Sequence, residues 1–134
     1  MISIVIPTHS IPERDFFFSR LLQSIASQTY KDYEIVTQND DEGRGMAHNT
    51  NECIKRCKGE LIKVMQMDDF FAHPQALERI VASFMPDDQW LVTACVHTTD
   101  GENRLNPHYP EWNNEVNWSQ CEYCSSDISI SSCS

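Results

Sequence analysis

The chain has 134 residues, of which 40% are hydrophobic, and its formal net charge is −10. This composition is typical of a single globular domain, and a chain of this length can build one hydrophobic core. No apolar run reaches the roughly 18 residues of a membrane span, and the negative charge disfavours a general nucleic-acid-binding protein. The first residues lack the features of a signal peptide, so we expect a cytoplasmic protein without a membrane span.

The negative charge is concentrated in the second half of the chain. Residues 1–66 hold nine acidic and eight basic residues, whereas residues 67–134 hold eleven acidic and two basic ones. A bound divalent cation would relieve part of this repulsion, although a solvated acidic surface is the simpler explanation.

The first half of the chain alternates between strand and helix patterns. A short run of β-branched residues predicts a buried strand over residues 2–6, ended by Pro7. Apolar residues at helical spacing predict a helix over residues 14–28. A second strand is expected over residues 33–38, and the acidic, glycine-containing segment 39–45 predicts a turn.

The alternation continues in the middle of the chain. We expect a helix over residues 46–57, a strand over residues 61–65, a helix from Pro74 to about residue 85, and a fourth strand over residues 90–96. Strands that alternate with helices indicate βαβ units, so the predicted class is α/β with a mainly parallel sheet and flanking helices.

The last part of the chain lacks such a pattern. Residues 100–134 show little periodicity, and we expect a long loop followed by an irregular, Ser- and Cys-rich tail of the same domain. The spacing Cys121-x-x-Cys124, followed by Cys133, is the one arrangement typical of metal ligands. A closed zinc site needs a fourth ligand, and the nearest candidate, His108, has no recognisable spacing, so we do not expect zinc there.

Acidic residues follow the third predicted strand. Asp68 and Asp69 come directly after it, and two neighbouring carboxylates repel each other unless a cation binds. Mg²⁺ or Mn²⁺ suits such a pair when phosphate oxygens complete the metal's ligands. The alternative interpretation is that these acids cap the N-terminus of the helix that begins near Pro74.

Two further polar residues are expected at the same edge of the sheet, because the carboxyl ends of parallel strands lie together. Asp40 follows the second strand and either accepts a hydrogen bond from a ligand or closes an Asx turn. Thr8 follows the first strand and offers a hydroxyl group to the same ligand. The sequence contains no phosphate-binding glycine loop, no H-E-x-x-H motif and no nucleophile elbow.

Several segments, taken in order, resemble the family 2 glycosyltransferases of the GT-A fold. These segments are residues 2–9, 22–36, 45–51, 57–62 and 67–69. The resemblance covers about residues 1–97, and its most specific feature is the S-I-x-x-Q-T-Y sequence combined with an acidic strand end. It implies a Rossmann-like GT-A fold, in which residues 1–99 form the nucleotide-sugar-binding part and residues 100–134 the loop and tail.

The resemblance also implies roles for individual residues. A nucleotide-diphospho-sugar, usually a UDP-sugar, would bind across the strand ends, with Mn²⁺ or Mg²⁺ held against the diphosphate. The nucleotide-sugar would contact Pro7, Thr8, His9, Asp40 and Asp68, and the metal would be bound by Asp69. The implied activity is a metal-dependent transfer of the sugar, with inversion, to a saccharide or lipid-linked acceptor that the sequence does not identify.

The chain departs from the family pattern at three places. The usual Asp-Asp-Gly-Ser ending of the second strand is here residues 39–42, Asn-Asp-Asp-Glu. The first acid of a D-x-D motif would fall at Gln66 or Met67, neither of which is acidic. No counterpart of the family's catalytic base is found, although Asp100, Glu102, Glu111 and Glu115 follow. The family's catalytic domain is commonly longer, so we expect this chain to hold the donor-binding half. Two alternatives follow: a nucleotide- or nucleotide-sugar-binding module without turnover, or a phosphoacceptor or phosphatase-like domain.

Overall fold

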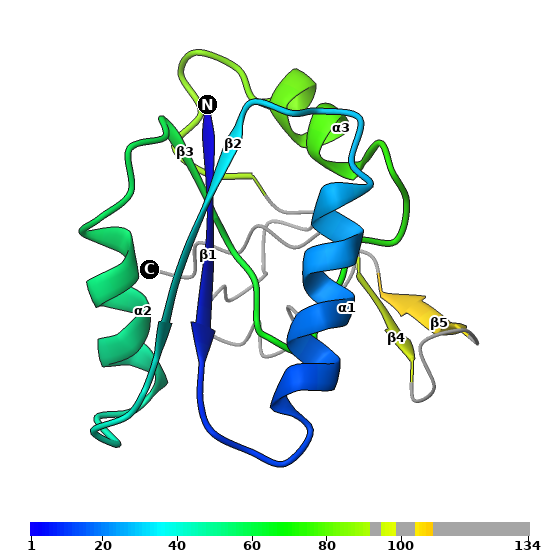
Figure 1. Cartoon of the computed structure of the whole chain (residues 1–134). Coiled ribbons are helices and arrows are strands. Elements are labelled where there is room, and N and C mark those ends of the chain that lie inside the picture. The colour runs from blue at the N-terminus through cyan, green and yellow to red at the C-terminus, as the bar shows by residue number, and fades with distance from the viewer. Residues whose placement is uncertain (92–94, 99–103, 109–134) are drawn as a thin grey trace, which may run out of the picture.

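The computed structural model of the chain describes residues 1–91, 95–98 and 104–108 (Figure 1). The elements in chain order are β1 (Ile2–Thr8), α1 (Arg14–Ala26), β2 (Tyr33–Asn39), α2 (Met46–Ile54), β3 (Leu61–Val64), α3 (Ala76–Ser83), β4 (Cys95–Thr98) and β5 (Arg104–His108). The predicted alternation of strands and helices is therefore confirmed up to α3. None of the helices in these ranges is long and apolar enough to cross a membrane.

The strands β1, β2 and β3 form an open, fully parallel sheet with β1 in the middle, in the order β2-β1-β3. In this register Ile4 of β1 lies beside Ile35 of β2 and Lys63 of β3. Every residue of β1 is buried, as its apolar sequence predicts. The arrangement is that of a small Rossmann-like α/β sheet.

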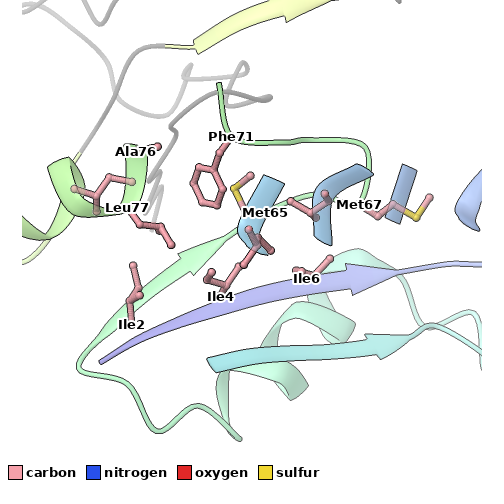
Figure 2. Packing of buried hydrophobic residues seen from close by; sticks show 11 residues of the cluster. Ile2, Ile4, Ile6, Met65, Met67, Phe71, Ala76 and Leu77 are labelled. Carbon is pink, nitrogen blue, oxygen red and sulfur yellow. The ribbon is translucent and has the colours of Figure 1, made fainter. Parts of the chain in front are cut away.

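Helices cover both faces of the sheet. The three isoleucines of β1 point toward the layer of α1 and α3, where they pack with Leu21 and Leu77 (Figure 2). Val5 points to the other face and packs with Cys53 of α2. Figure 1 shows α2 on one side of the sheet and α1 and α3 on the other. The buried faces of both layers therefore follow from the alternation of side chains along β1.

The strand β1 continues through Pro7, which we expected to end it. Pro7 pairs with Gln38 and Thr8 with Asn39. The main chain of Val5 faces β3, because its carbonyl accepts a hydrogen bond of 2.8 Å from the N–H of Met65. Pro7, two residues further, faces the same side, and there the pairing with β3 has already ended. Its missing N–H therefore breaks no hydrogen bond of the sheet.

The predicted fourth parallel strand is wrong. Residues 95–98 form β4, which pairs antiparallel with β5 in a separate two-stranded sheet. The strand β5 also lies in the segment that we expected to be a loop. Pro107 of β5 pairs with Val96 beside a register irregularity, a position that tolerates proline, and this proline hides the strand in the sequence. The predicted tail and its cysteines, from residue 109 onward, lie outside the described residues.

The segment S-I-x-x-Q-T-Y joins α1 to α3. Gln28 is buried, and its Nε2 donates hydrogen bonds of 3.0 Å to the carbonyls of Ser24 and His73. Its Oε1 accepts a hydrogen bond of 3.0 Å from the N–H of Leu77. The N–H of Thr29 donates to the carbonyl of Pro74 at 2.7 Å. Pro74 is thus held outside α3, which begins two residues later than predicted.

The opposite end of the sheet depends on a close approach at Gly59. The N–H of Gly59 donates to Ser3 Oγ at 2.8 Å, and Ser3 Oγ donates to Glu34 Oε1 at 2.6 Å. A Cβ atom on Gly59 would lie 2.6 Å from the main-chain nitrogen of Ser3 and 2.8 Å from the carbonyl oxygen of Met1. Only glycine therefore fits between α2 and β3.

We predict that Gly59→Ala lowers the free energy of unfolding by about 1–3 kcal/mol, because the added methyl group meets main-chain atoms that cannot rotate away. Chemical denaturation measures this loss. Gly43→Asn is the matched control: nothing lies within 4 Å of a Cβ there, and Asn tolerates the local φ of +65°. Equal stability of Gly59→Ala and the wild-type chain would contradict the close approach.

Candidate functional site

The carboxyl ends of β1, β2 and β3 open into one hollow of about 680 Å³, here called the strand-end pocket. All six site residues predicted from the sequence line it: Pro7, Thr8, His9, Asp40, Asp68 and Asp69. Its volume lies in the range of pockets that bind small molecules. The structure therefore brings together three segments that are far apart in the sequence, as parallel strand ends require.

The first strand contributes mainly its backbone. Thr8 is buried, and its hydroxyl donates to Asn39 Oδ1 at 3.1 Å. Its carbonyl accepts a hydrogen bond of 2.8 Å from the N–H of Asp40. His9 lies just beyond β1 and is exposed. The hydroxyl of Thr8 thus joins the ends of β1 and β2, which fixes one wall of the pocket.

Asn49 of α2 is a pocket residue that the sequence analysis missed. It is 2% exposed, and its Nδ2 donates to the carbonyl of Thr8 at 3.2 Å and to that of Gln38 at 2.8 Å. One amide group therefore holds the ends of two strands together. The sequence offered one indication of its burial: Asn49 lies four residues before Cys53, so the two side chains share the buried face of α2. Asn51, two residues further along α2, is exposed.

Asp40 closes the loop between β2 and α2. Its two carboxylate oxygens accept hydrogen bonds of 2.8 Å from the N–H groups of Arg44 and Gly45. The bonds from Gly45 and then Arg44 hold the pKa of this carboxyl below its usual value. Gly43 and Gly45 have φ angles of +65° and +93°, which lie in the left-handed region that glycine adopts without strain. Asp40 therefore forms the turn, and the same residue lines the pocket.

Asp68 and Asp69 follow β3 in a tight turn. The carboxylate of Asp69 accepts a hydrogen bond of 3.2 Å from the N–H of Gln66, and the N–H of Asp69 donates to the carbonyl of Gln66 at 3.0 Å. Asp69 is 3% exposed, whereas Asp68 is exposed to solvent. The alternative that these acids cap the next helix is wrong, because α3 begins at Ala76 and its N-cap residue is Gln75.

Apolar side chains form the remaining walls of the pocket. Ile11, Phe17, Met46 and Met67 all line it. Phe17 is only partly buried, and Met46 is exposed. A pocket with apolar walls and a few polar groups at one end suits a ligand that has a flat ring and a charged part.

The acidic end of the pocket fits a metal only together with a ligand. In the part of the chain that the structure describes, no group of three or more His, Cys, Asp or Glu side chains could hold an ion. Asp68 and Asp69 offer hard carboxylate oxygens, which Mg²⁺ and Mn²⁺ prefer, but two side chains leave most of an octahedral shell open. The donor set therefore suits an ion that shares its shell with phosphate oxygens and water.

We predict that the Asp40 carboxyl titrates below its ordinary pKa of about 3.9, because its charged form accepts two main-chain hydrogen bonds. Its contribution to stability is then complete above that ordinary value and is lost as the pH falls through the lowered pKa. Carboxyl chemical shifts from an NMR pH titration measure the pKa. Asp40→Asn should also speed amide hydrogen exchange at Arg44 and Gly45, whereas the neighbouring Asp41→Asn should leave it unchanged. An ordinary pKa would contradict the loop geometry.

Comparison with known proteins assigns no family to this arrangement: no protein-family model matches the chain, and no curated protein matches it significantly. The argument for function therefore depends on the pocket. The pocket combines the buried carboxylate of Asp69, the exposed carboxylate of Asp68 and the turn-forming Asp40 with apolar walls. All of them lie at the carboxyl edge of a parallel sheet.

Proposed function

We propose that the strand-end pocket binds a nucleotide-diphospho-sugar together with Mn²⁺ or Mg²⁺, and that the chain is a GT-A-type glycosyltransferase or its donor-binding part. The observation that carries this proposal is that all six residues assigned to the donor and its metal line one pocket. These residues come from three separate strand ends, and random placement on a surface would not gather them.

The topology supports a ligand at this place. The chain passes from β1 through α1 to β2 on one side of β1, and from β2 through α2 to β3 on its other side. The helices α1 and α2 cover opposite faces of the sheet. The order of the strands therefore reverses between β1 and β3. In open α/β sheets this switch point, at the carboxyl ends of the strands, is where ligands bind. Pro7 and Asp69, from its two sides, both line the pocket.

The proposed donor would lie with its nucleoside near β1 and β2 and its diphosphate near β3. The carboxyl of Asp40 has a lowered pKa and is charged at neutral pH, so it can only accept hydrogen bonds, as from a base N–H or a ribose hydroxyl. Phe17 and Met46 offer apolar surface to the base. Asp68 and Asp69 would hold the metal ion, which neutralises the departing nucleoside diphosphate.

Transfer of the sugar also needs a group that takes the proton of the acceptor hydroxyl. Among the described residues, the carboxylates that line the pocket are Asp40, Asp68 and Asp69, and all three are assigned to the donor or its metal. The four acids considered for this role in the sequence lie outside the described residues. The described part of the pocket thus holds groups for binding but offers no further carboxylate as the base, which is the observation behind the second candidate function, a nucleotide-sugar-binding module without turnover. Release or transfer of the sugar from a radiolabelled UDP-sugar would distinguish the enzyme from the module.

We predict that a nucleoside diphosphate stabilises the chain only when a divalent metal is present. At one hundred times its dissociation constant, a ligand raises the free energy of unfolding by about 2.7 kcal/mol. Thermal unfolding with UDP, GDP, CDP or TDP, each with Mn²⁺, Mg²⁺ or EDTA, measures the effect. A shift with one nucleotide and metal identifies the donor class, whereas no shift with any combination would contradict the proposed function.

We predict that Asp69→Asn removes the metal-dependent part of nucleotide binding and reduces affinity for the UDP–Mn²⁺ pair at least tenfold. The Asn side chain keeps an oxygen that can accept the hydrogen bond from Gln66, so the turn is retained while the charge is lost. Titration calorimetry with and without EDTA measures both affinities. Asp87→Asn, an exposed position outside the pocket, is the control. Unchanged binding in Asp69→Asn would show that the metal site is assigned wrongly.

A further inference from the structure

Three polar side chains of the first helical segment bind the main chain that carries the acidic residues. Arg20 Nη2 donates to the carbonyl of Asp68 at 2.9 Å, Ser24 Oγ accepts from the N–H of Phe71 at 3.1 Å, and Gln28 Nε2 donates to the carbonyl of His73 at 3.0 Å. The three side chains are four residues apart in sequence, which places Arg20 and Ser24 on one face of α1. Residues 66–71, here called the acidic loop, are thus held along α1.

Arg20 makes a second contact with the acidic loop. Its guanidinium lies 4.4 Å from the ring centroid of Phe70, which directly follows Asp69. It also lies 5.5 Å from the ring centroid of Phe17 and 5.7 Å from that of Phe16, both on α1. These distances are within the range of cation–π attraction. One cation therefore joins the aromatic rings of α1 to the acidic loop.

The position of this cation matches what an acidic metal site needs. Neighbouring carboxylates repel each other, so a loop that presents two of them tends to move apart or outward unless it is anchored. Arg20 places a positive charge beside the loop, yet its hydrogen bond goes to the main-chain carbonyl of Asp68. The carboxylate oxygens of Asp68 are thereby left to a metal ion. Charge-assisted bonds of this kind are stronger than those between neutral groups.

We infer that Arg20 is a positioning residue, which fixes the acidic loop so that Asp68 and Asp69 are held ready for a metal–diphosphate ligand. The ligand part of this inference rests on the proposed function, whereas the anchoring part does not. Ser24 and Gln28 hold the following residues, so loss of Arg20 frees the acidic end of the loop while α3 stays docked.

Hydrogen exchange without any ligand tests the anchoring part. In Arg20→Gln, the amides of residues 67–70 should exchange roughly tenfold faster or more, whereas the amides of α2 should keep the wild-type rates. Arg14→Gln is the matched control, because Arg14 is also on α1 and lies 5.6 Å from an aromatic ring, that of Phe18, but makes its ion pair with Asp15. Unchanged exchange at residues 67–70 in Arg20→Gln would overturn the inference.

Titration calorimetry with UDP then tests the consequence for the ligand. In Arg20→Gln, affinity for UDP with Mn²⁺ should fall at least tenfold, while affinity for UDP in EDTA should stay unchanged, and Arg20→Lys should recover part of the loss. An equal loss with and without metal would overturn the positioning role, since it would mean general damage to the pocket. A wild-type chain that binds no nucleotide would refute the proposed function, and the exchange experiment would still decide whether Arg20 anchors the loop.

Discussion

The strand β1 is buried on both faces and paired on both edges, and the position of every candidate site residue depends on it. Its side chains define the two helical layers, and its register with β2 and β3 brings their carboxyl ends to one edge of the sheet. Asn49 and Thr8 then connect the ends of β1 and β2, and α1 holds the loop after β3. The strand-end pocket is the space that these connections leave open.

Local periodicity was sufficient to predict the first three strands, their helices and the gathering of strand ends, because burial imposes a period of two or about 3.6 on the sequence. Periodicity does not predict contacts between segments that are far apart in the sequence. The apolar run near residue 95 gave no sign of its partner β5, and Lys63, which an isolated strand would direct to solvent, is fully buried beside Ile4. The roles of Arg20 and Asn49 depend likewise on what lies opposite them.

The side chains of the S-I-x-x-Q-T-Y segment have a structural role. Ser24 binds the main chain of Phe71, and Gln28 joins the end of α1 to the start of α3, so both side chains stabilise the fold. A sequence motif of this kind is therefore stronger evidence for the fold than for a particular reaction. The chemistry is argued from the residues that these contacts place, Asp68 and Asp69, and from their neighbours across the pocket.

Pro7 has a consequence for the pocket itself. In a parallel ladder the next hydrogen bond from β1 to β3 beyond Val5 would be donated by residue 7, and proline has no N–H to donate. The hydrogen bond from the N–H of Met65 to the carbonyl of Val5 is therefore the last between the two strands, and Pro7 cannot extend the pairing beyond it. Pairing between β1 and β3 thus stops short of the strand-end pocket, which Pro7 lines at the place where the order of the sheet reverses.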